Sequence, residues 1–559
     1  MRDAYSVSQV RAAENRLFAL VPDGALMQRA AAGLAAVCAD LLRAGAGGVY
    51  GARVVVLAGT GDNGGDALYA GARLAGRGAA VTAIQAGERL HAGGARALLD
   101  AGGRIIQLEP GFGDQQDVFV RADEDPDRHD VGYEVRSAMG RADLIVDGML
   151  GIGGSGGLRE PYATLAELAA RARNATTVAV DLPSGIDADT GAVAGPAVRA
   201  DVTVTFGAVK PGLLVDPGAG HAGVVEFVDI GLGPYLDGMP AVSAPQAQDI
   251  AALLPHPTAE SDKYRRGVVG LLVGSDRYTG AALLATGGAV RGGAGMVRLV
   301  TFPNAATGVR HVHPEVVITE LGGETTTRSA APQFTPATAR FAGEHHAPPE
   351  DLHPVPASPH GAGLLDSVGR VQAWTVGSGM GTDDAAVGRL AEVLATNLPV
   401  LVDADGLTIL AKHRELLPRP APTLLTPHAG ELGRLLDADP ADIEARRLEH
   451  ARLAAAKLGA CVLLKGSTTV VAPPDGRDPV LVNTTGTSWL ATAGTGDVLA
   501  GLAGALLAQG LLPPQAAITA AYLHGLAARL AARGAVTDGE APIGASDVVT
   551  ALPLAFHAL

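Results

Sequence analysis

The chain has 559 residues, too many for one ordinary hydrophobic core, so the sequence predicts at least two domains. The net charge of −15 argues against nucleic acid or an anionic membrane as a partner. The two cysteines, Cys38 and Cys461, each lie in an apolar run, which argues against a disulfide framework and makes the cytoplasm the expected compartment. The polar residues 1–17 do not resemble a signal peptide.

Strands alternate with helical Ala/Leu/Arg stretches in both halves of the chain, which is typical of α/β folds with largely parallel sheets. The first half has buried-strand patterns at 53–59, 80–86, 142–148, 175–184 and 200–207. The second half has them at 268–275, 373–379, 399–406, 421–428 and 461–467. Glycine and proline interrupt both periodicities near 233–249, so the expected domains are 1–235 and 250–559, with 236–249 as a linker.

Two segments lack the periodicity of packed elements and are expected to be flexible surface insertions, 109–138 and 322–364. The histidines of the second, at 345, 346, 353 and 360, have no fixed ligand spacing, so a solvated loop is favoured over a metal site. The apolar run 498–512 is too short to span a membrane and is expected to be a buried helix.

The stretch RVVVLAGTGDNGGDALYAGARLAGRG (53–78) is expected to fold as strand, glycine-rich turn and helix. Free backbone N–H groups at the start of the helix would face the turn and favour a phosphate or another anion. A tight turn without a ligand is the alternative. Two further strands end at Asp147 and at Asp181, with Ser184 close behind. Together with Asn63 these residues form an oxygen-rich set suited to a hard cation, unless each aspartate merely caps a helix or turn.

On these motifs, residues 1–235 resemble the NAD(P)H-hydrate epimerase family, whose Rossmann-like three-layer domain carries a GxGNNGGDG motif. SVSQVRAAENRLF, GALMQRAAAGLA and TFGAVKPGLL match the family too. The resemblance implies that Asn63, Asp147 and Ser184 hold a potassium ion and that Asp181 contacts substrate as the acid/base. Asp62 and Ala67 depart from the family's usual Asn and Gly. The implied substrate contacts are Asp62, Asn63, Gly64, Gly65, Asp66, Gly151, Ile152, Gly153, Gly154, Ser155, Gly156, Gly157 and Asp181.

In the second half, ATAGTGDVLAG (491–501) places Gly494 and Gly496 before an apolar helix that is expected to begin near Asp497. The turn's N–H groups and the helix dipole would face a transferring phosphoryl group, and Asp497 could accept a proton from an attacking hydroxyl. A capping aspartate without catalysis is the alternative. Lys465, in a chain poor in lysine, follows a strand and suits phosphate contact.

Residues 250–559 resemble the ribokinase-like superfamily and, within it, the ADP/ATP-dependent NAD(P)H-hydrate dehydratases, through LTPHAGE, LLKG, ATAGTGD and GAGMVRL. Ser378 stands where the family usually has proline. The resemblance implies that Ala281, Gly381, His428 and Asp497 contact the hydrated cofactor. It implies ADP as co-substrate, Mg²⁺ bridging the nucleotide oxygens, and nucleotide contacts from Lys465, Gly466, Ser467, Thr468, Thr469 and Gly496.

The two resemblances together predict a repair enzyme for hydrated NADH and NADPH (NADHX and NADPHX). One half would interconvert the R and S epimers, and the other would dehydrate the S epimer with ADP, giving AMP and phosphate. The expected assembly is a homo-oligomer. The alternative is a kinase for a small alcohol, such as a vitamin precursor, carrying a non-catalytic nucleotide-binding module at its N-terminus.

Overall fold

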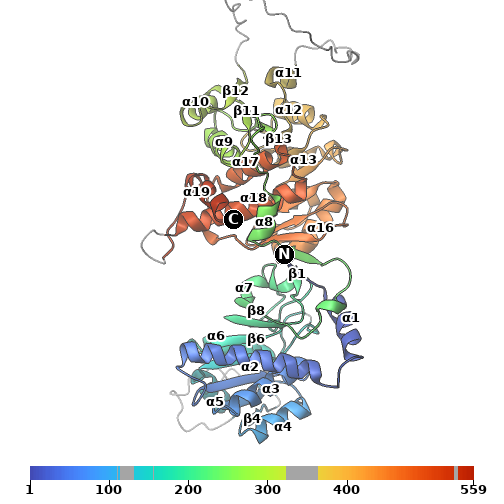
Figure 1. Ribbon diagram of the computed structural model, residues 1–559, viewed down its shortest axis with the longest axis vertical. Coiled ribbons are helices and arrows are strands. Elements are labelled where there is room, and N and C mark those ends of the chain that lie inside the picture. Colours follow the sequence, from blue (N-terminus) through green and yellow to red (C-terminus); the bar gives the residue numbers. More distant parts are fainter. Residues whose placement is uncertain (110, 114–130, 155, 323–362, 534–538) are drawn as a thin grey trace, which may run out of the picture.

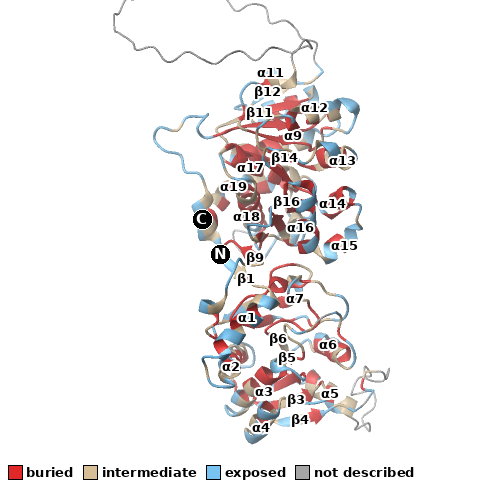
Figure 2. Ribbon diagram, turned by 90° about the vertical axis from the view of Figure 1, so that its right-hand side faces the viewer, coloured by how far each residue is buried: buried red, intermediate tan, exposed pale blue. Residues whose placement is uncertain are grey.

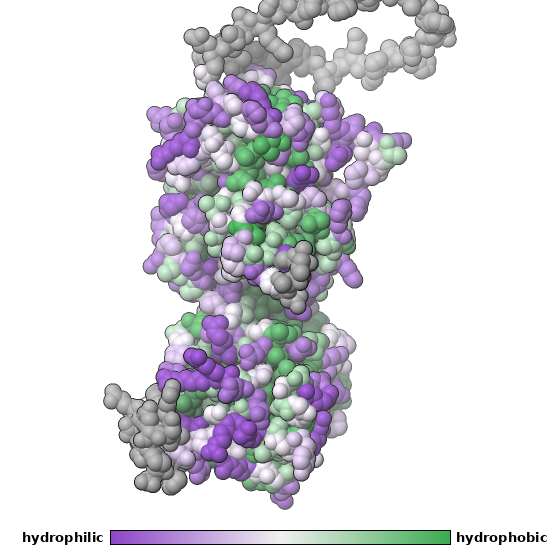
Figure 3. Space-filling model, turned by 90° about the vertical axis from the view of Figure 1, so that its left-hand side faces the viewer, coloured by the Kyte–Doolittle hydropathy of each residue, from purple (hydrophilic) through white to green (hydrophobic). Residues whose placement is uncertain are grey.

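The computed structural model describes residues 1–109, 111–113, 131–154, 156–322, 363–533 and 539–559. The two halves of the chain form two α/β units stacked along the long axis of the molecule (Figure 1). The molecule narrows between them (Figure 3).

The N-terminal unit is built on one parallel sheet, in the strand order β4-β3-β2-β5-β6-β7-β8. The order reverses direction between β2 and β5, which makes the sheet doubly wound. The strands are β2 (Arg53–Ala58), β3 (Ala80–Gln85), β4 (Arg104–Gln107), β5 (Leu144–Gly148), β6 (Thr176–Val180), β7 (Val202–Phe206) and β8 (Val224–Val228).

Alternate residues of β2 enter two separate cores, which confirms the three-layer arrangement. Val54 and Val56 belong to the core formed with α1 to α4, whereas Val55 and Leu57 belong to the core formed with α5 and α6. Figure 2 shows these buried strands between the helices. The helices are α1 (Val7–Phe18), α2 (Ala25–Gly45), α3 (Asp62–Ala75), α4 (Ala92–Asp100), α5 (Val131–Gly140), α6 (Tyr162–Arg171) and α7 (Ala219–Ala222), with 3-10 turns η2 (Pro211–Leu213) and η3 (Gly233–Tyr235).

The C-terminal unit is built on an eleven-stranded mixed sheet, in the order β1-β9-β18-β17-β16-β15-β14-β13-β10-β11-β12. The seven strands from β16 to the edge strand β12 are parallel, while β17 pairs antiparallel with both β16 and β18. The strands are β1 (Arg2–Ala4), β9 (Val242–Ala244), β10 (Val268–Leu272), β11 (Met296–Thr301), β12 (Val317–Glu320), β13 (Ala373–Val376), β14 (Val400–Val402), β15 (Thr423–Leu425), β16 (Cys461–Leu464), β17 (Thr469–Ala472) and β18 (Val480–Asn483).

Helices cover both faces of this sheet, which confirms the predicted α/β class for the second half. One face packs against α9 (Thr279–Arg291), α10 (Pro303–Val312), α17 (Thr495–Ala508), α18 (Pro513–Ala532) and α19 (Ala545–His557). The other packs against α11 (Leu364–Val368), α12 (Asp384–Leu394), α13 (Ala404–Lys412), α14 (Ala429–Leu436), α15 (Pro440–Ala445) and α16 (Arg447–Leu458). The remaining elements are α8 (Ala247–Leu253), η4 (Arg414–Leu416) and η5 (Ser488–Leu490).

The start of the chain and the segment that follows the N-terminal half both contribute strands to the sheet of the C-terminal unit. The first strand, β1, pairs antiparallel with β9, and β9 pairs with β18. The segment 236–249, predicted to be a linker, therefore contains a sheet strand and the start of α8. In Figure 1 the N-terminus lies at the junction of the two units.

The segment 109–138 was predicted to be irregular throughout, and its last part is not. Residues 131–138 belong to α5, whose Val135 and Met139 are buried against the sheet. The helix α5 is short and follows an acidic stretch of sequence, so its helical periodicity was not recognised. Residues 114–130, residues 323–362 and the histidines at 345, 346, 353 and 360 lie outside the described residues.

Two apolar helices contribute to the cores: α17 is buried almost throughout, and α2 packs with one face. The predicted buried helix is α17, in which every residue from Val498 to Ala508 is buried. Among the described residues, one helix, α2, is long and apolar enough to cross a membrane, with 21 residues. Its Leu34, Cys38 and Leu42 belong to the core of the N-terminal unit, as expected for a core helix.

We expect Gly501→Ala to destabilise the C-terminal unit by about 1–3 kcal/mol. A Cβ at Gly501 would lie 1.9 Å from the Ala285 carbonyl oxygen, because α17 and α9 pack closely there. The matched control is Gly388→Ala on the exposed face of α12, where a Cβ meets nothing within 4 Å and should stabilise by up to about 1 kcal/mol. Calorimetric unfolding measures both. Equal stability of the two variants would contradict the packing.

Candidate functional sites

The first site lies at the carboxyl ends of the N-terminal strands. Close backbone approach requires glycine in the turn after β2: a Cβ at Gly59 would lie 1.9 Å from the Met149 carbonyl oxygen. The turn borders a cavity of about 670 Å³. The predicted residues that line the cavity are Asp62, Asn63, Asp66, Gly151, Ile152, Gly153, Gly154 and Asp181.

Among the described residues, six other predicted ones do not line that cavity: Gly64, Gly65, Asp147, Gly156, Gly157 and Ser184. Gly64 and Gly65 are buried in the first turn of α3, where their lack of side chains allows close packing against Gly59 and Met27. Gly156 has a positive φ of 75°, and Gly157 lies against Gly195. Ser155 is not among the described residues.

The predicted cation ligands converge around the Leu150 carbonyl. The Asn63 amide donates to that oxygen at 3.1 Å, and the Ser184 hydroxyl lies 3.2 Å from it. Asp147 accepts from the Ser184 hydroxyl at 2.7 Å and from the Ser184 amide at 2.8 Å. Asp147 is fully buried, and this burial raises its pKa to about 6 in spite of the hydrogen bonds. A buried carboxylate among oxygen donors fits a cation that prefers oxygen ligands.

Asp181 forms a buried ion pair that sequence reasoning missed. Its carboxylate accepts from the Lys210 ammonium, from the Phe206 amide at 3.1 Å and from the Thr205 hydroxyl at 3.2 Å. Lys210 is 1% exposed. Asp181 also has a positive φ of 64°, a conformation that is strained for a residue with a Cβ. Since these contacts hold it there, the carboxylate has a fixed position at the cavity wall.

Further acidic groups face the same cavity. Burial, followed by the charges of Asp181 and Asp62, raises the pKa of Asp66 well above its usual value. Burial also raises the pKa of Glu14, and α1 contributes Arg11 beside it. Sequence reasoning assigned no role to Glu14 or Arg11, although both stand in the stretch SVSQVRAAENRLF that signalled the family.

The second site lies at the start of α17. Gly494 caps this helix with a φ of 90°, and the helix begins at Thr495, so its free N–H groups face the turn. A Cβ at Gly496 would lie 3.6 Å from the Lys465 ammonium, which places that lysine against the turn. Lys465 also binds the Asp403 carboxylate at 2.7 Å and lies 3.8 Å from Glu431. Positive charge and helix N–H groups are thus directed to one place.

Asp497 faces this cluster. Burial, with the charge of Asp403, raises the pKa of Asp497 to about 6, against a hydrogen bond from Ser378 and the charge of Lys465. Asp403 and Ser378 received no role from the sequence. Asp403 nevertheless follows a buried strand, the same signal that singled out Asp147 and Asp181.

The remaining predicted residues of the second half lie in turns, at the starts of helices and at the start of a strand. Gly381 has a φ of 83° and donates its amide to Asp405 at 3.0 Å. His428 caps α14, and its side chain is 57% exposed. Ala281 lies in the first turn of α9, against the Gly379 turn. Gly466 and Ser467 form an exposed tip between β16 and β17, whereas Thr468 is buried and Thr469 begins β17.

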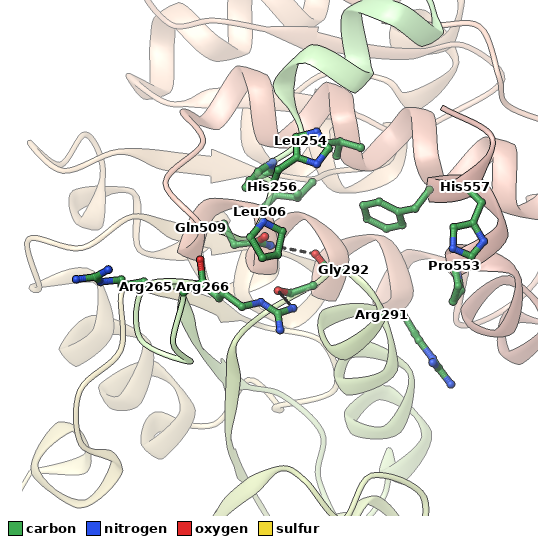
Figure 4. Close-up of a pocket in the computed structure, with 15 residues that line it drawn as sticks. Leu254, His256, Arg265, Arg266, Arg291, Gly292, Leu506, Gln509, Pro553 and His557 are labelled. Atoms are coloured by element: carbon green, nitrogen blue, oxygen red, sulfur yellow. Dashed lines mark hydrogen bonds between the residues drawn. The ribbon is translucent and has the colours of Figure 1, made fainter. Parts of the chain in front are cut away.

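A second cavity, of about 600 Å³, lies elsewhere in the C-terminal unit, between the segment after α8 and the end of α19 (Figure 4). It is lined by Arg266, which donates to the Gly293 carbonyl, and by Gln509, which donates to the Gly292 carbonyl. Arg265 and Arg291 point away from it in Figure 4. Its lining contains none of the predicted site residues.

Comparisons with known proteins match the two halves of the chain to two different family models. A family model described as NAD(P)H-hydrate dehydratase matches residues 269–550, and one described as YjeF-related protein N-terminus matches residues 23–212. The bifunctional NAD(P)H-hydrate repair enzyme of Mycobacterium tuberculosis is 44% identical over 521 residues, which cover 92% of this chain and 91% of that protein. The enzyme of Mycobacterium leprae is 42% identical over the full length of both.

The chain belongs to the family of bifunctional NAD(P)H-hydrate repair enzymes. We therefore call its two units the epimerase half and the dehydratase half. Among solved structures, the ADP/ATP-dependent NAD(P)H-hydrate dehydratase of Bacillus subtilis, crystallised with ATP and Mg²⁺, is 28% identical. It covers 56% of this chain and 97% of its own, with a TM-score of 0.43.

We expect Lys210→Met to destabilise the epimerase half by about 3–5 kcal/mol, because it leaves the Asp181 carboxylate buried without its counter-charge. The double variant with Asp181→Asn removes that charge and should recover part of the loss. Calorimetric unfolding measures the change. Lys457→Met, at an exposed position of α16, is the matched control and should stay within about 0.5 kcal/mol. A Lys210→Met protein as stable as this control would contradict the ion pair.

Proposed function

We propose that the epimerase half interconverts the R and S epimers of NADHX and NADPHX, and that the dehydratase half returns the S epimer to NADH or NADPH with ADP as phosphoryl donor. One observation carries the proposal: Asp497, Lys465 and the start of α17 meet in one place. This arrangement suits transfer of a phosphoryl group to a hydroxyl. The family supplies the identity of that hydroxyl.

In the proposed dehydration, Asp497 accepts the proton of the C6 hydroxyl as its oxygen attacks the β-phosphorus of ADP. The bond between that phosphorus and the bridging oxygen breaks and AMP leaves. The ring nitrogen then expels phosphate from C6, and loss of a proton from C5 restores the dihydropyridine. Lys465 and the N–H groups of Thr495 and Gly496 would stabilise the charge on the moving group. Dehydration thus proceeds through phosphorylation because hydroxide is a poor leaving group.

Mg²⁺, when bound, would neutralise negative charge on the phosphates of the nucleotide. Among the described residues, no three His, Cys, Asp or Glu side chains gather as a metal cage. That fits an ion held largely by the nucleotide and water. Asp403 and Asp405, whose charges act on the Asp497 carboxyl, are the carboxylates that would hold the ion.

In the proposed epimerisation, Asp181 moves a proton near the C6 centre, which makes both epimers available to the dehydratase half. We propose Asn63, Asp147 and Ser184 as the ligands of a potassium ion. The buried carboxylate of Asp147 supports this, since a bound cation would supply its missing counter-charge. The predicted substrate contacts are part of this proposal: residues 62–66, residues 151–157 and Asp181 in the epimerase half, and Ala281, Gly381, His428 and Asp497 in the dehydratase half. So are the predicted nucleotide contacts, residues 465–469 and Gly496.

We also propose a cytoplasmic location, without nucleic-acid or membrane partners. The two cysteines are free and buried, which suits a reducing compartment. A homo-oligomeric assembly stays a prediction.

Two single variants should separate the activities. Asp497→Asn is expected to lower dehydration of the S epimer about 10²–10⁴-fold and to leave epimerisation intact, since it removes only the proton acceptor. Asp181→Asn should do the reverse, leaving the R epimer unconsumed; because it also leaves the buried Lys210 ammonium unpaired, its unfolding is measured beside its activity. The return of dihydronicotinamide absorbance measures dehydration, and chromatography of the two epimers measures epimerisation. An Asp497→Asn enzyme with normal dehydration would remove that residue from the mechanism.

The pH dependence of dehydration should follow Asp497. The base must be ionised, so kcat/KM is expected to fall as the pH drops through about 6, the raised pKa of this carboxyl. Ser378→Ala removes a hydrogen bond that lowers the pKa, so the acid limb should move to higher pH. Ser367→Ala, at an exposed position remote from the cluster, should leave the limb in place. An acid limb near the ordinary value of 3.8 would contradict the role of burial.

A further inference from the structure

The epimerase half touches the dehydratase half at the predicted nucleotide turn. The segment that follows Lys210 continues through η2, and its Leu213, Leu214 and Val215 are buried in the same apolar cluster as Leu464 and Val470 of the strands beside the turn. The next residue is Asp216. The end of this segment is therefore fixed by packing against the second half.

Asp216 and Thr468 are joined by two hydrogen bonds across this contact. The Thr468 hydroxyl donates to the Asp216 carboxylate at 2.8 Å and accepts from the Asp216 amide at 3.0 Å. Thr468 is 5% exposed. The other carboxylate oxygen of Asp216 accepts from the Gly220 amide at 2.9 Å, which orients the side chain from its own half. Bonds to an ionised acceptor are stronger than neutral ones, so this pair holds the turn firmly.

Arg447 lies under the same turn. It is 6% exposed, and its guanidinium donates to the Lys465 carbonyl at 3.4 Å. A Cβ at Gly466 would lie 1.9 Å from that guanidinium, so the backbone of the turn packs directly against the Arg447 side chain. Burial lowers the pKa of Arg447, and the charges of Glu444 and Asp216 oppose that shift. The turn is thus held at Lys465 by Arg447 and at Thr468 by Asp216, while Gly466 and Ser467 at its tip are exposed.

We propose that Asp216 of the epimerase half is a positioning residue for the nucleotide site of the dehydratase half. By holding Thr468 it fixes the turn 465–469 in the conformation that receives the phosphates of ADP, so less ordering is left to occur on binding. The inference rests on the proposed function, which assigns this turn to ADP. It adds that the affinity of one half for its nucleotide depends on a residue of the other.

The test is the binding of ADP with Mg²⁺ to the full chain, measured by calorimetry. Asp216→Ala and Thr468→Val should each weaken ADP about 10-fold. Their combination should be little worse than either alone, because each removes the same pair of bonds. Thr468→Ser, which keeps the hydroxyl, should recover most of the affinity lost in Thr468→Val.

Steady-state kinetics should separate positioning from catalysis. In Asp216→Ala the KM for ADP is expected to rise about 10-fold while kcat at saturating ADP changes by less than about 3-fold. The matched control is Arg452→Met, which removes another contact at the junction of the halves, a bond to the Ala241 carbonyl at 2.7 Å, and should leave ADP affinity unchanged.

The outcomes are distinguishable. A wild-type chain that binds no ADP would contradict the proposed function itself. A wild-type chain that binds ADP, with Asp216→Ala and Thr468→Val binding it equally well, would overturn only the positioning role. If Asp216→Ala misfolds, seen as lost epimerase activity, Asp216→Asn and Thr468→Val decide: a normal affinity in both overturns the proposal, and a weakened affinity in both supports it.

Discussion

Both sites depend on one constraint: parallel strands end at the same edge of a sheet, and there the backbone must turn without side chains. Gly59 packs against the Met149 carbonyl, and Gly377 packs against the Asp403 carbonyl. A Cβ on either glycine would lie 1.9 Å from that carbonyl oxygen. These close approaches bring successive strand ends together. They carry Asp147 and Asp181 into one cluster and Asp403 into the other, where each meets groups far away in the sequence.

Burial then determines what those carboxylates can do. Asp181 is neutralised by Lys210, and Asp403 is paired with Lys465. Asp147 and Asp497 have no such direct partner among the described residues, and burial raises the pKa of each to about 6. Pairs of carboxyl groups in contrasting surroundings are a common means of dividing structural from proton-transferring roles. In the dehydratase half the contrast supports the proposed role of Asp497 as the base, while the Asp403 carboxylate binds the Lys465 ammonium. In the epimerase half Asp181 lines the cavity and Asp147 does not, which fits their proposed roles as acid/base and cation ligand.

Much of this arrangement could be predicted from sequence because the central strands are buried on both faces and therefore read as continuous apolar runs. The ten strands predicted are present, each shorter by one or more residues at one end or at both. The strands β1, β4, β8, β9, β11, β12, β17 and β18 were missed; β8 is an edge strand with exposed residues such as Val224 and Phe227. Lys210 was missed because its partner is 29 residues away and no local pattern links them. Asp403 could have been found, since it follows a strand exactly as Asp147 and Asp181 do.

The pairing of β1 with β9 has a consequence for how the chain can be divided. In the intact protein, β9 covers the outer side of β18, and β1 covers β9 in turn. A dehydratase half produced on its own from residue 250 would lack both, leaving the N–H and C=O groups on the outer edge of β18 unpaired. Bare sheet edges invite strand addition from other molecules. The two strands that flank the epimerase half in the sequence thus protect the edge of the neighbouring sheet.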